Sequence, residues 1–170
     1  MHSTDEIVQV VDRDNKETGA VSRKVMRAQA LIHRACYILV FNDAGELYLQ
    51  KRTETKDLYP GCWDVAAGGV VLAGESYEKS AVRELAEELG VDGVSFTTLF
   101  DSFFEEEDNR VWGRIFTCTH NGPFTLQKEE VQYGQFMTVD DILELSNREP
   151  FTPDGVDILK RVRAQQNTGN

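Results

Sequence analysis

The chain has 170 residues, 41% of them hydrophobic, which is enough for a single domain with a substantial core. Its 18 basic and 29 acidic residues give a formal net charge of −11, which disfavours long-range attraction to nucleic acid or to an anionic membrane. A phosphate-bearing ligand must therefore be held by local cations or by a metal. Because the three cysteines are far apart and no signal peptide or membrane span is recognisable, we expect a soluble cytoplasmic protein.

Hydrophobic patterning and turn signals predict the following elements. In chain order they are a strand at 7–13, a turn at 14–19, a short helix capped by Ser22, strands at 35–41 and 46–52 around the hairpin signal NDAG, and a short strand at 63–69. They continue with a helix capped by Ser76 that ends at Gly90, strands at 94–104 and 111–120 around an acidic turn, a helix at 139–145 capped by Thr138, and a last helix from about Asp154.

Strands interspersed with helices and hairpins indicate an α/β (α+β) fold, in which a mixed β-sheet is sandwiched between helices. We expect one domain over residues 1–170, with a short N-terminal strand-and-helix extension over 1–33. The polar tail from Arg163 is expected to fray.

The predicted helix after Ser76 carries acids at an unusual spacing. At about 100° per residue, Glu84, Glu87 and Glu88 share one arc of the helix. Like charges at these spacings repel, and the negative end of the helix dipole opposes them further. Either they are an ordinary solvated face, or they bind a cation that reverses both penalties. Because all the ligands are oxygens, the cation would be a hard ion, Mg²⁺ or Mn²⁺.

The spacing around these acids favours the metal. Gly69 is followed by Glu75, then by Arg83-Glu84-Leu85, Glu87-Glu88 and Gly90-Val91. This pattern, G-x5-E-x7-R-E-U-x-E-E-x-G-U with U aliphatic, resembles the Nudix box of the Nudix hydrolase superfamily and spans residues 69–91. The resemblance implies a Nudix fold and metal-dependent hydrolysis of a phosphoanhydride bond in a nucleoside diphosphate linked to another moiety, X.

The resemblance also implies roles for individual box residues. Glu84, Glu88 and Glu87 are the expected metal ligands, joined by the main-chain carbonyl of Gly68. Arg83 is expected to orient a box carboxylate, with Glu75 as its partner, through charge-assisted hydrogen bonds.

The general base is either a box glutamate, Glu87 or Glu88, or an acid on a later loop. In the later stretch KEEV, Glu130 is preferred to Glu129, because a similar stretch recurs in relatives. An ordinary exposed acidic loop is the alternative for this stretch.

Residues 31–63 resemble the corresponding part of type 1 isopentenyl-diphosphate isomerases, a branch with the Nudix fold. By this resemblance Arg52 and Lys56 bind the substrate diphosphate, the alternative being two ordinary surface cations. His33 matches a metal-site histidine, but its partner position holds Met26, so we expect a structural histidine.

The departures from the isomerases decide the expected chemistry. Isomerisation needs a cysteine directly before the box glycine and a histidine directly after it, and these positions hold Gly68 and Val70. The second acid-base glutamate falls on Arg110. Without an acid-base pair there is no route for moving a proton across an allyl system, so hydrolysis is favoured.

The sequence thus predicts a Mg²⁺- or Mn²⁺-dependent pyrophosphohydrolase acting on a small-molecule diphosphate, in a chain that is compatible with a homodimer. A catalytically idle domain that senses a nucleotide diphosphate is the alternative, although the complete glutamate set argues against it. An RNA 5′-end pyrophosphohydrolase is disfavoured by the net charge of −11. Aromatic residues such as Trp63, Trp112, Tyr37 and Phe116 are typical of core strands and do not identify X.

Overall fold

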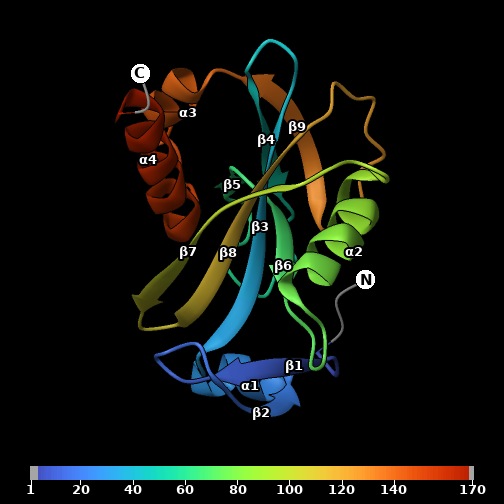
Figure 1. Ribbon diagram of the computed structural model, residues 1–170, viewed down its shortest axis with the longest axis vertical. Helices are drawn as coiled ribbons and strands as arrows, with labels where there is room; N and C mark the ends of the chain where they lie inside the picture. Colours follow the sequence, from blue (N-terminus) through green and yellow to red (C-terminus); the bar gives the residue numbers. More distant parts are fainter. Residues whose placement is uncertain (1–3, 169–170) are drawn as a thin grey trace.

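The computed structural model describes residues 4–168, which form a nine-stranded mixed sheet and four helices. The strands are β1 (Ile7–Val11), β2 (Glu17–Ser22), β3 (His33–Phe41), β4 (Leu47–Arg52), β5 (Trp63–Asp64), β6 (Ala67–Val70), β7 (Thr97–Glu106), β8 (Asn109–Thr119) and β9 (Val131–Met137). The helices are α1 (Arg23–Gln29), α2 (Tyr77–Leu89), α3 (Val139–Leu145) and α4 (Pro153–Thr168). Figure 1 shows α2 on one side of the sheet and α3 and α4 on the other, which confirms the predicted sandwich.

Strand β3 lies at the centre of the sheet. It pairs in parallel with β8, from His33 opposite Val111 to Phe41 opposite Thr119, and antiparallel with β6. The NDAG turn joins β3 to β4 as predicted, but only Phe41 and Leu47 pair across it. Beyond this pair β4 takes β5 and β9 as neighbours, so the hairpin is short. The strands separate instead, and residues of β3, β4, β5 and β6 line the pocket described below.

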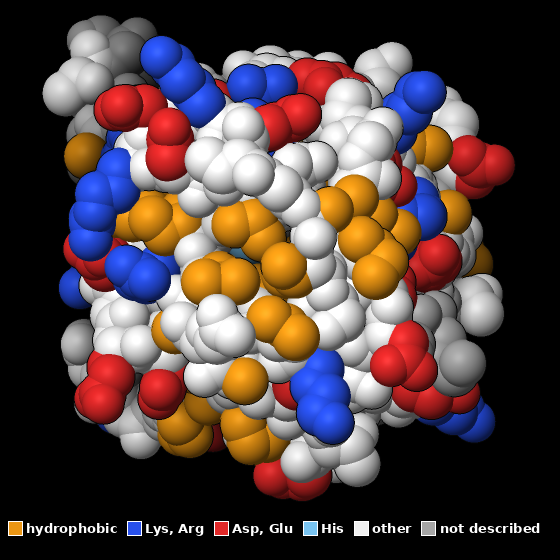
Figure 2. Space-filling view, turned by 90° about the horizontal axis from the view of Figure 1, so that it is seen from below, with side chains coloured by type: hydrophobic (Ala, Val, Ile, Leu, Met, Phe, Trp, Pro, Cys, Tyr) orange, Lys and Arg blue, Asp and Glu red, His pale blue; other side chains and the backbone are white. Residues whose placement is uncertain are grey.

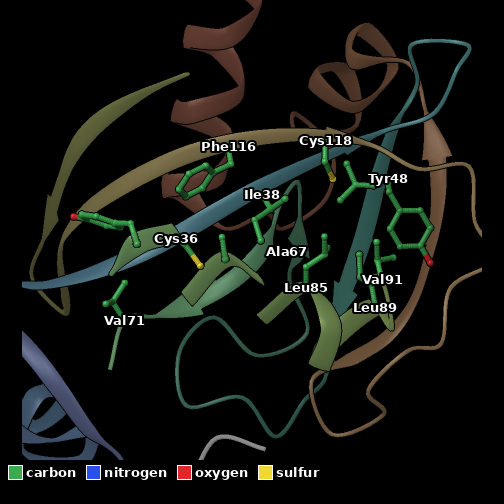
Figure 3. Packing of buried hydrophobic residues seen from close by; sticks show 13 residues of the cluster. Cys36, Ile38, Tyr48, Ala67, Val71, Leu85, Leu89, Val91, Phe116 and Cys118 are labelled. Carbon is green, nitrogen blue, oxygen red and sulfur yellow. The ribbon is translucent and has the colours of Figure 1, made fainter. Parts of the chain in front are cut away.

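Alternate residues of β3 belong to two different cores. Cys36 and Ile38 pack in the cluster that contains Leu85 and Leu89 of α2, and Figure 3 shows these side chains between the helix and the sheet. Leu39 belongs to a second cluster, to which α3 and α4 contribute. The period-2 alternation of a strand covered on both faces therefore produces the layered architecture.

The N-terminal extension differs most from the prediction. Residues 17–22, expected to be part of a turn and its flank, form β2 and pair with β1. The helix α1 begins after the Ser22 cap and ends at Ala30, which adopts the left-handed conformation with φ of 48°. The bottom of the molecule, which this extension forms, exposes a group of hydrophobic side chains (Figure 2). Ile7 and Val25 are 52% and 37% exposed.

Two further elements were not predicted correctly. Strand β9, with the sequence VQYGQFM, was missed, and it forms by pairing with β4. Helix α4 continues to Thr168, so the expected fraying from Arg163 is wrong for the described residues. Across residues 4–168, no helix is long and apolar enough to cross a membrane.

Candidate active site

The two consecutive glycines of β6 fix the start of the site. Gly68 has φ of +136°, and a Cβ on it would lie 2.0 Å from the carbonyl oxygen of Cys36. A Cβ on Gly69 would lie 2.7 Å from Oε1 of Glu84. Real Cβ atoms do not approach other atoms this closely, so Gly68 must be glycine, and a side chain at Gly69 would displace the Glu84 carboxylate. The absence of side chains lets β6 contact both β3 and the carboxylates of α2.

Helix α2 begins and ends where the sequence signals predict. The Oγ of Ser76 accepts a hydrogen bond from the backbone N–H of Lys79 at 3.1 Å, and Gly90 ends the helix with φ of 66°. This register directs Glu84 and Glu88 toward β6, where Glu88 Oε1 accepts a hydrogen bond from Gly68 N–H at 2.7 Å. The box therefore folds as a strand, a loop and a helix.

The carboxylates of α2 do not form a solvated face. Glu84 is completely buried and Glu88 is 6% exposed, whereas the side chain of Glu87 remains 34% exposed. Burying a carboxylate is costly unless hydrogen bonds or a cation compensate for the lost water. Two buried acids on one helix face thus need a local source of positive charge.

Arg83 supplies part of this charge and holds three box carboxylates. Its Nε and Nη2 donate to the two oxygens of Glu75 at 2.8 and 2.9 Å, and its Nη1 donates to Glu84 at 2.9 Å and to Glu87 at 3.4 Å. Burial opposes ionisation of Glu75, but the hydrogen bonds from Arg83 lower the pKa of Glu75. The predicted pairing of Arg83 with Glu75 is confirmed, and the same guanidinium also holds Glu84.

The donor set fits a hard divalent ion in its chemistry. Carboxylate oxygens from α2 contact β6 at Gly68 and Gly69, which have no side chains. The backbone carbonyl of Gly68 is a further oxygen ligand of the kind that such an ion takes. As the side chains stand, no group of three or more His, Cys, Asp or Glu in residues 4–168 forms a metal cage. Glu84 and Glu87 instead accept hydrogen bonds from Arg83.

The later loop places Glu130 beside a predicted substrate-binding residue. Glu130 is only 7% exposed and forms an ion pair with Nζ of Lys56, whereas Glu129 is exposed. Gln127 N–H donates to the carbonyl of Glu88 at 2.9 Å, which ties this loop to the end of α2. Thr53 N–H also bonds the Glu130 carbonyl, at 3.3 Å. The expectation of an exposed acidic loop does not hold for Glu130.

Arg52 and Lys56 line the same pocket as Gly68 and Gly69. The guanidinium of Arg52 donates from Nη1 to Asp64 at 3.2 Å, and its other nitrogens donate to the carbonyls of residues 58 and 59. Both cations are mostly buried, with side chains 19% and 10% exposed. They are therefore held at a concave surface rather than extended into solvent.

Two further cations in this pocket were missed from the sequence. Arg23 and Arg27 of α1 donate to Asp57 at 2.9 and 3.1 Å, and both line the pocket. Burial opposes ionisation of Asp57, but the two guanidinium groups bring the pKa of Asp57 well below its usual range. The spacing i, i+4 on a capped helix was the available signal, because it places both arginines on one face.

His33 has the structural role that the sequence predicts. It is 2% exposed, and its Nδ1 lies 3.0 Å from the carbonyl of Leu31. Burial, with the charge of Arg27 adding to it, lowers the pKa of His33 to about 3, so the imidazole is neutral. Met26, at the position of the missing partner histidine, is buried in the N-terminal core.

The sequence profile of the NUDIX domain family matches residues 31–162 of this chain. The chain belongs to the Nudix hydrolase family. It is 46% identical over 154 residues to an uncharacterised Nudix hydrolase of Yersinia pestis, covering 91% of this chain and 84% of the relative. It is 44% identical, over the same shares of each chain, to the uncharacterised Nudix hydrolase YfcD of Escherichia coli.

Solved structures confirm the Nudix fold. The crystal structure of DR0079 from Deinococcus radiodurans matches with a TM-score of 0.81 at 23% identity, covering 92% of this chain and 98% of that one. Enzymes of this family hydrolyse pyrophosphate bonds in compounds linked to nucleoside diphosphates. The family assignment thus agrees with the box pattern and with the sandwich of helices around a mixed sheet.

Proposed function

We propose that this Nudix hydrolase uses Mg²⁺ or Mn²⁺ to hydrolyse a phosphoanhydride bond in a small nucleoside diphosphate derivative. One observation carries the proposal. Gly68 and Gly69 contact the buried carboxylates of α2 and also line a pocket that contains four cationic side chains. These cations are Arg23, Arg27, Arg52 and Lys56. Metal-ligating oxygens and phosphate-binding cations therefore flank the same two residues.

Glu84, Glu87 and Glu88, with the carbonyl of Gly68, would hold the metal. When bound, a divalent ion supplies positive charge for the phosphoryl oxygens and promotes ionisation of water. These side chains are suited to be ligands, because an ionised carboxylate accepts hydrogen bonds or coordinates a cation and has no hydrogen to donate. Arg83 keeps Glu84 in place through its hydrogen bond at 2.9 Å.

The cationic pocket would bind the diphosphate and orient it. Guanidinium groups present fixed pairs of donors that match phosphate oxygens, and partial burial strengthens their interaction with an anion. Asp57 forms ion pairs with both Arg23 and Arg27, so a phosphate would compete with Asp57 for the same donors. Because the net charge of the chain is −11, an anionic substrate must be held by this local cluster of cations.

Glu130 is the proposed general base. It is buried, it is next to Lys56 of the pocket, and its loop is bonded to the end of α2. A carboxylate in this position can accept the proton of the attacking water, while Lys56 keeps the side chain oriented.

The test is Glu88→Gln, which keeps the shape of the side chain and removes its charge. We expect Mg²⁺-dependent hydrolysis, measured as formation of the phosphorylated products, to be lost, with an unchanged circular dichroism spectrum. Glu78→Gln is the matched control, because Glu78 lies on the same helix and is 58% exposed, in an ion pair with Arg114. The substrate panel contains nucleoside diphosphates, nucleotide sugars, dinucleotides and coenzyme A derivatives.

Wild-type activity in Glu88→Gln would contradict the metal-ligand role. Tight binding of nucleoside diphosphates with no turnover of any compound in the panel would favour the idle sensor instead.

A further inference from the structure

A second buried acid lies in the same pocket, away from α2. Asp154, in the first turn of α4, is 8% exposed and lines the pocket together with Arg52 and Gly68. Its Oδ2 accepts a hydrogen bond from the hydroxyl of Tyr37 at 2.7 Å. Its Oδ1 is buried and makes no hydrogen bond with any of the residues that the structure describes. Half of this carboxyl group is therefore unsatisfied.

The groups around Asp154 do not compensate for its burial. They are Tyr37 of β3, Asp64 of β5, Arg52 of β4 and Tyr59 of the following loop. Arg52 directs its donors to Asp64 and to two backbone carbonyls. Burial, followed by repulsion from Asp64, raises the pKa of Asp154 to about 6.

This arrangement differs from that of the other acids near the pocket. Asp57 and Glu130 both have cationic partners, whereas Asp154 faces another carboxylate. An acid in the first turn of a helix interacts favourably with the helix dipole, but that interaction does not require burial. Buried polar atoms without partners are rare in proteins and lower stability, so this one requires a functional explanation.

The pocket therefore contains both cationic and acidic side chains. Arg23, Arg27 and Lys56 are suited to phosphates, whereas Asp64 and Asp154 repel them. A diphosphate bound at the cations would direct the rest of the substrate toward the acids. That part of the substrate must be uncharged or cationic, and it must donate a hydrogen bond to satisfy Oδ1 of Asp154.

We infer that Asp154 determines specificity: its Oδ1 accepts a hydrogen bond from an N–H or O–H group on the non-phosphate part of the substrate. This inference rests on the proposed function, because it takes the diphosphate to lie at the cations. Tyr37 is a positioning residue, since its hydroxyl fixes the orientation of the carboxyl group. The donor is either a nucleobase amino group or a sugar hydroxyl.

The experiment compares Asp154→Asn with wild type in calorimetric binding assays without a divalent ion, so that the nucleotides bind but are not hydrolysed. ADP and purine riboside 5′-diphosphate differ in the base amino group, and ADP and 2′,3′-dideoxy-ADP differ in the sugar hydroxyls. Inorganic pyrophosphate has neither donor. Asp157→Asn is the matched control, because Asp157 is exposed on the same helix.

We expect Asp154→Asn to weaken ADP binding about 10- to 100-fold. Pyrophosphate binding should not weaken, because the substitution removes a negative charge from the pocket. If wild type binds one of the two analogues more weakly than ADP by the same factor, the group that this analogue lacks is the donor. The comparison thus identifies the base or the sugar. Asp154→Asn should also raise the melting temperature, since it removes a buried charge. A purely structural Asp154 would give a lower melting temperature and equal weakening of every probe, and this would overturn the inference.

The inference also fails if no donor-bearing probe binds wild type more tightly than pyrophosphate does. Binding is measured separately from turnover, so this outcome is distinct from failure of the proposed hydrolysis, which Glu88→Gln tests.

Discussion

Gly69→Ala tests how closely the box carboxylate must fit against β6. The added Cβ would lie 2.7 Å from Oε1 and 2.8 Å from Cδ of Glu84. Since carbon atoms pack best at about 3.5 Å or more, the carboxylate must move by roughly 0.7 Å. Glu84 is completely buried and bonded to Arg83, so little room exists for that movement.

The expected cost of this overpacking is about 1–3 kcal/mol of unfolding free energy. Displacing the proposed metal ligand Glu84 by this distance is expected to lower kcat on the order of 10- to 100-fold. Phosphate release and chemical denaturation measure the two effects. Gly19→Ala is the control, because a Cβ there meets nothing within 4 Å.

A second variant assigns the effect to Glu84. Glu84→Asp shortens the side chain by one methylene group and withdraws the carboxylate from Gly69. In that background Gly69→Ala should cost less unfolding free energy than in wild type, a coupling that a double-mutant cycle detects. Equal costs in both backgrounds, or full activity of Gly69→Ala alone, would refute this explanation.

Three further predictions concern the pocket. The pKa of Asp154 is about 6 against an ordinary 3.8, so the folded state keeps a proton that the unfolded state releases between these values. Wild type should therefore lose up to about 3 kcal/mol of stability, relative to Asp154→Asn, as the pH rises from about 4 to 6; parallel curves would contradict this. Asp57→Asn should instead destabilise the protein at pH 7, because its arginine partners lose their carboxylate. Arg27→Gln should raise KM for a diphosphate about 10-fold with little change in kcat, whereas Lys24→Gln, at an exposed position on the same helix, should change neither.

The box was predictable because its residues are close in the sequence. The Ser76 cap, the Gly90 terminus and the periodic core residues are local signals, and they placed α2 within one residue of its observed bounds. Strands β2 and β9 lack such signals. They carry polar and glycine residues at positions that other strands fill with hydrophobic ones, and their conformation depends on pairing with β1 and β4.

The pocket was less predictable, because its residues come from separate elements. Arg23 lies on α1, Asp57 on the loop after β4, Tyr37 on β3 and Asp154 on α4. Their approach follows from the sheet order and the packing of α4, neither of which has a short-range signature. The resemblance to isomerases singled out Arg52 and Lys56 but gave no indication that Lys56 pairs with Glu130.

Crystals soaked in Mn²⁺ test the central proposal most directly, because anomalous scattering locates the ion without a substrate. The proposal predicts a peak between Glu84, Glu87, Glu88 and the carbonyl of Gly68, absent from crystals of Glu88→Gln grown in the same way. Anomalous density only at remote surface acids in wild-type crystals would contradict it.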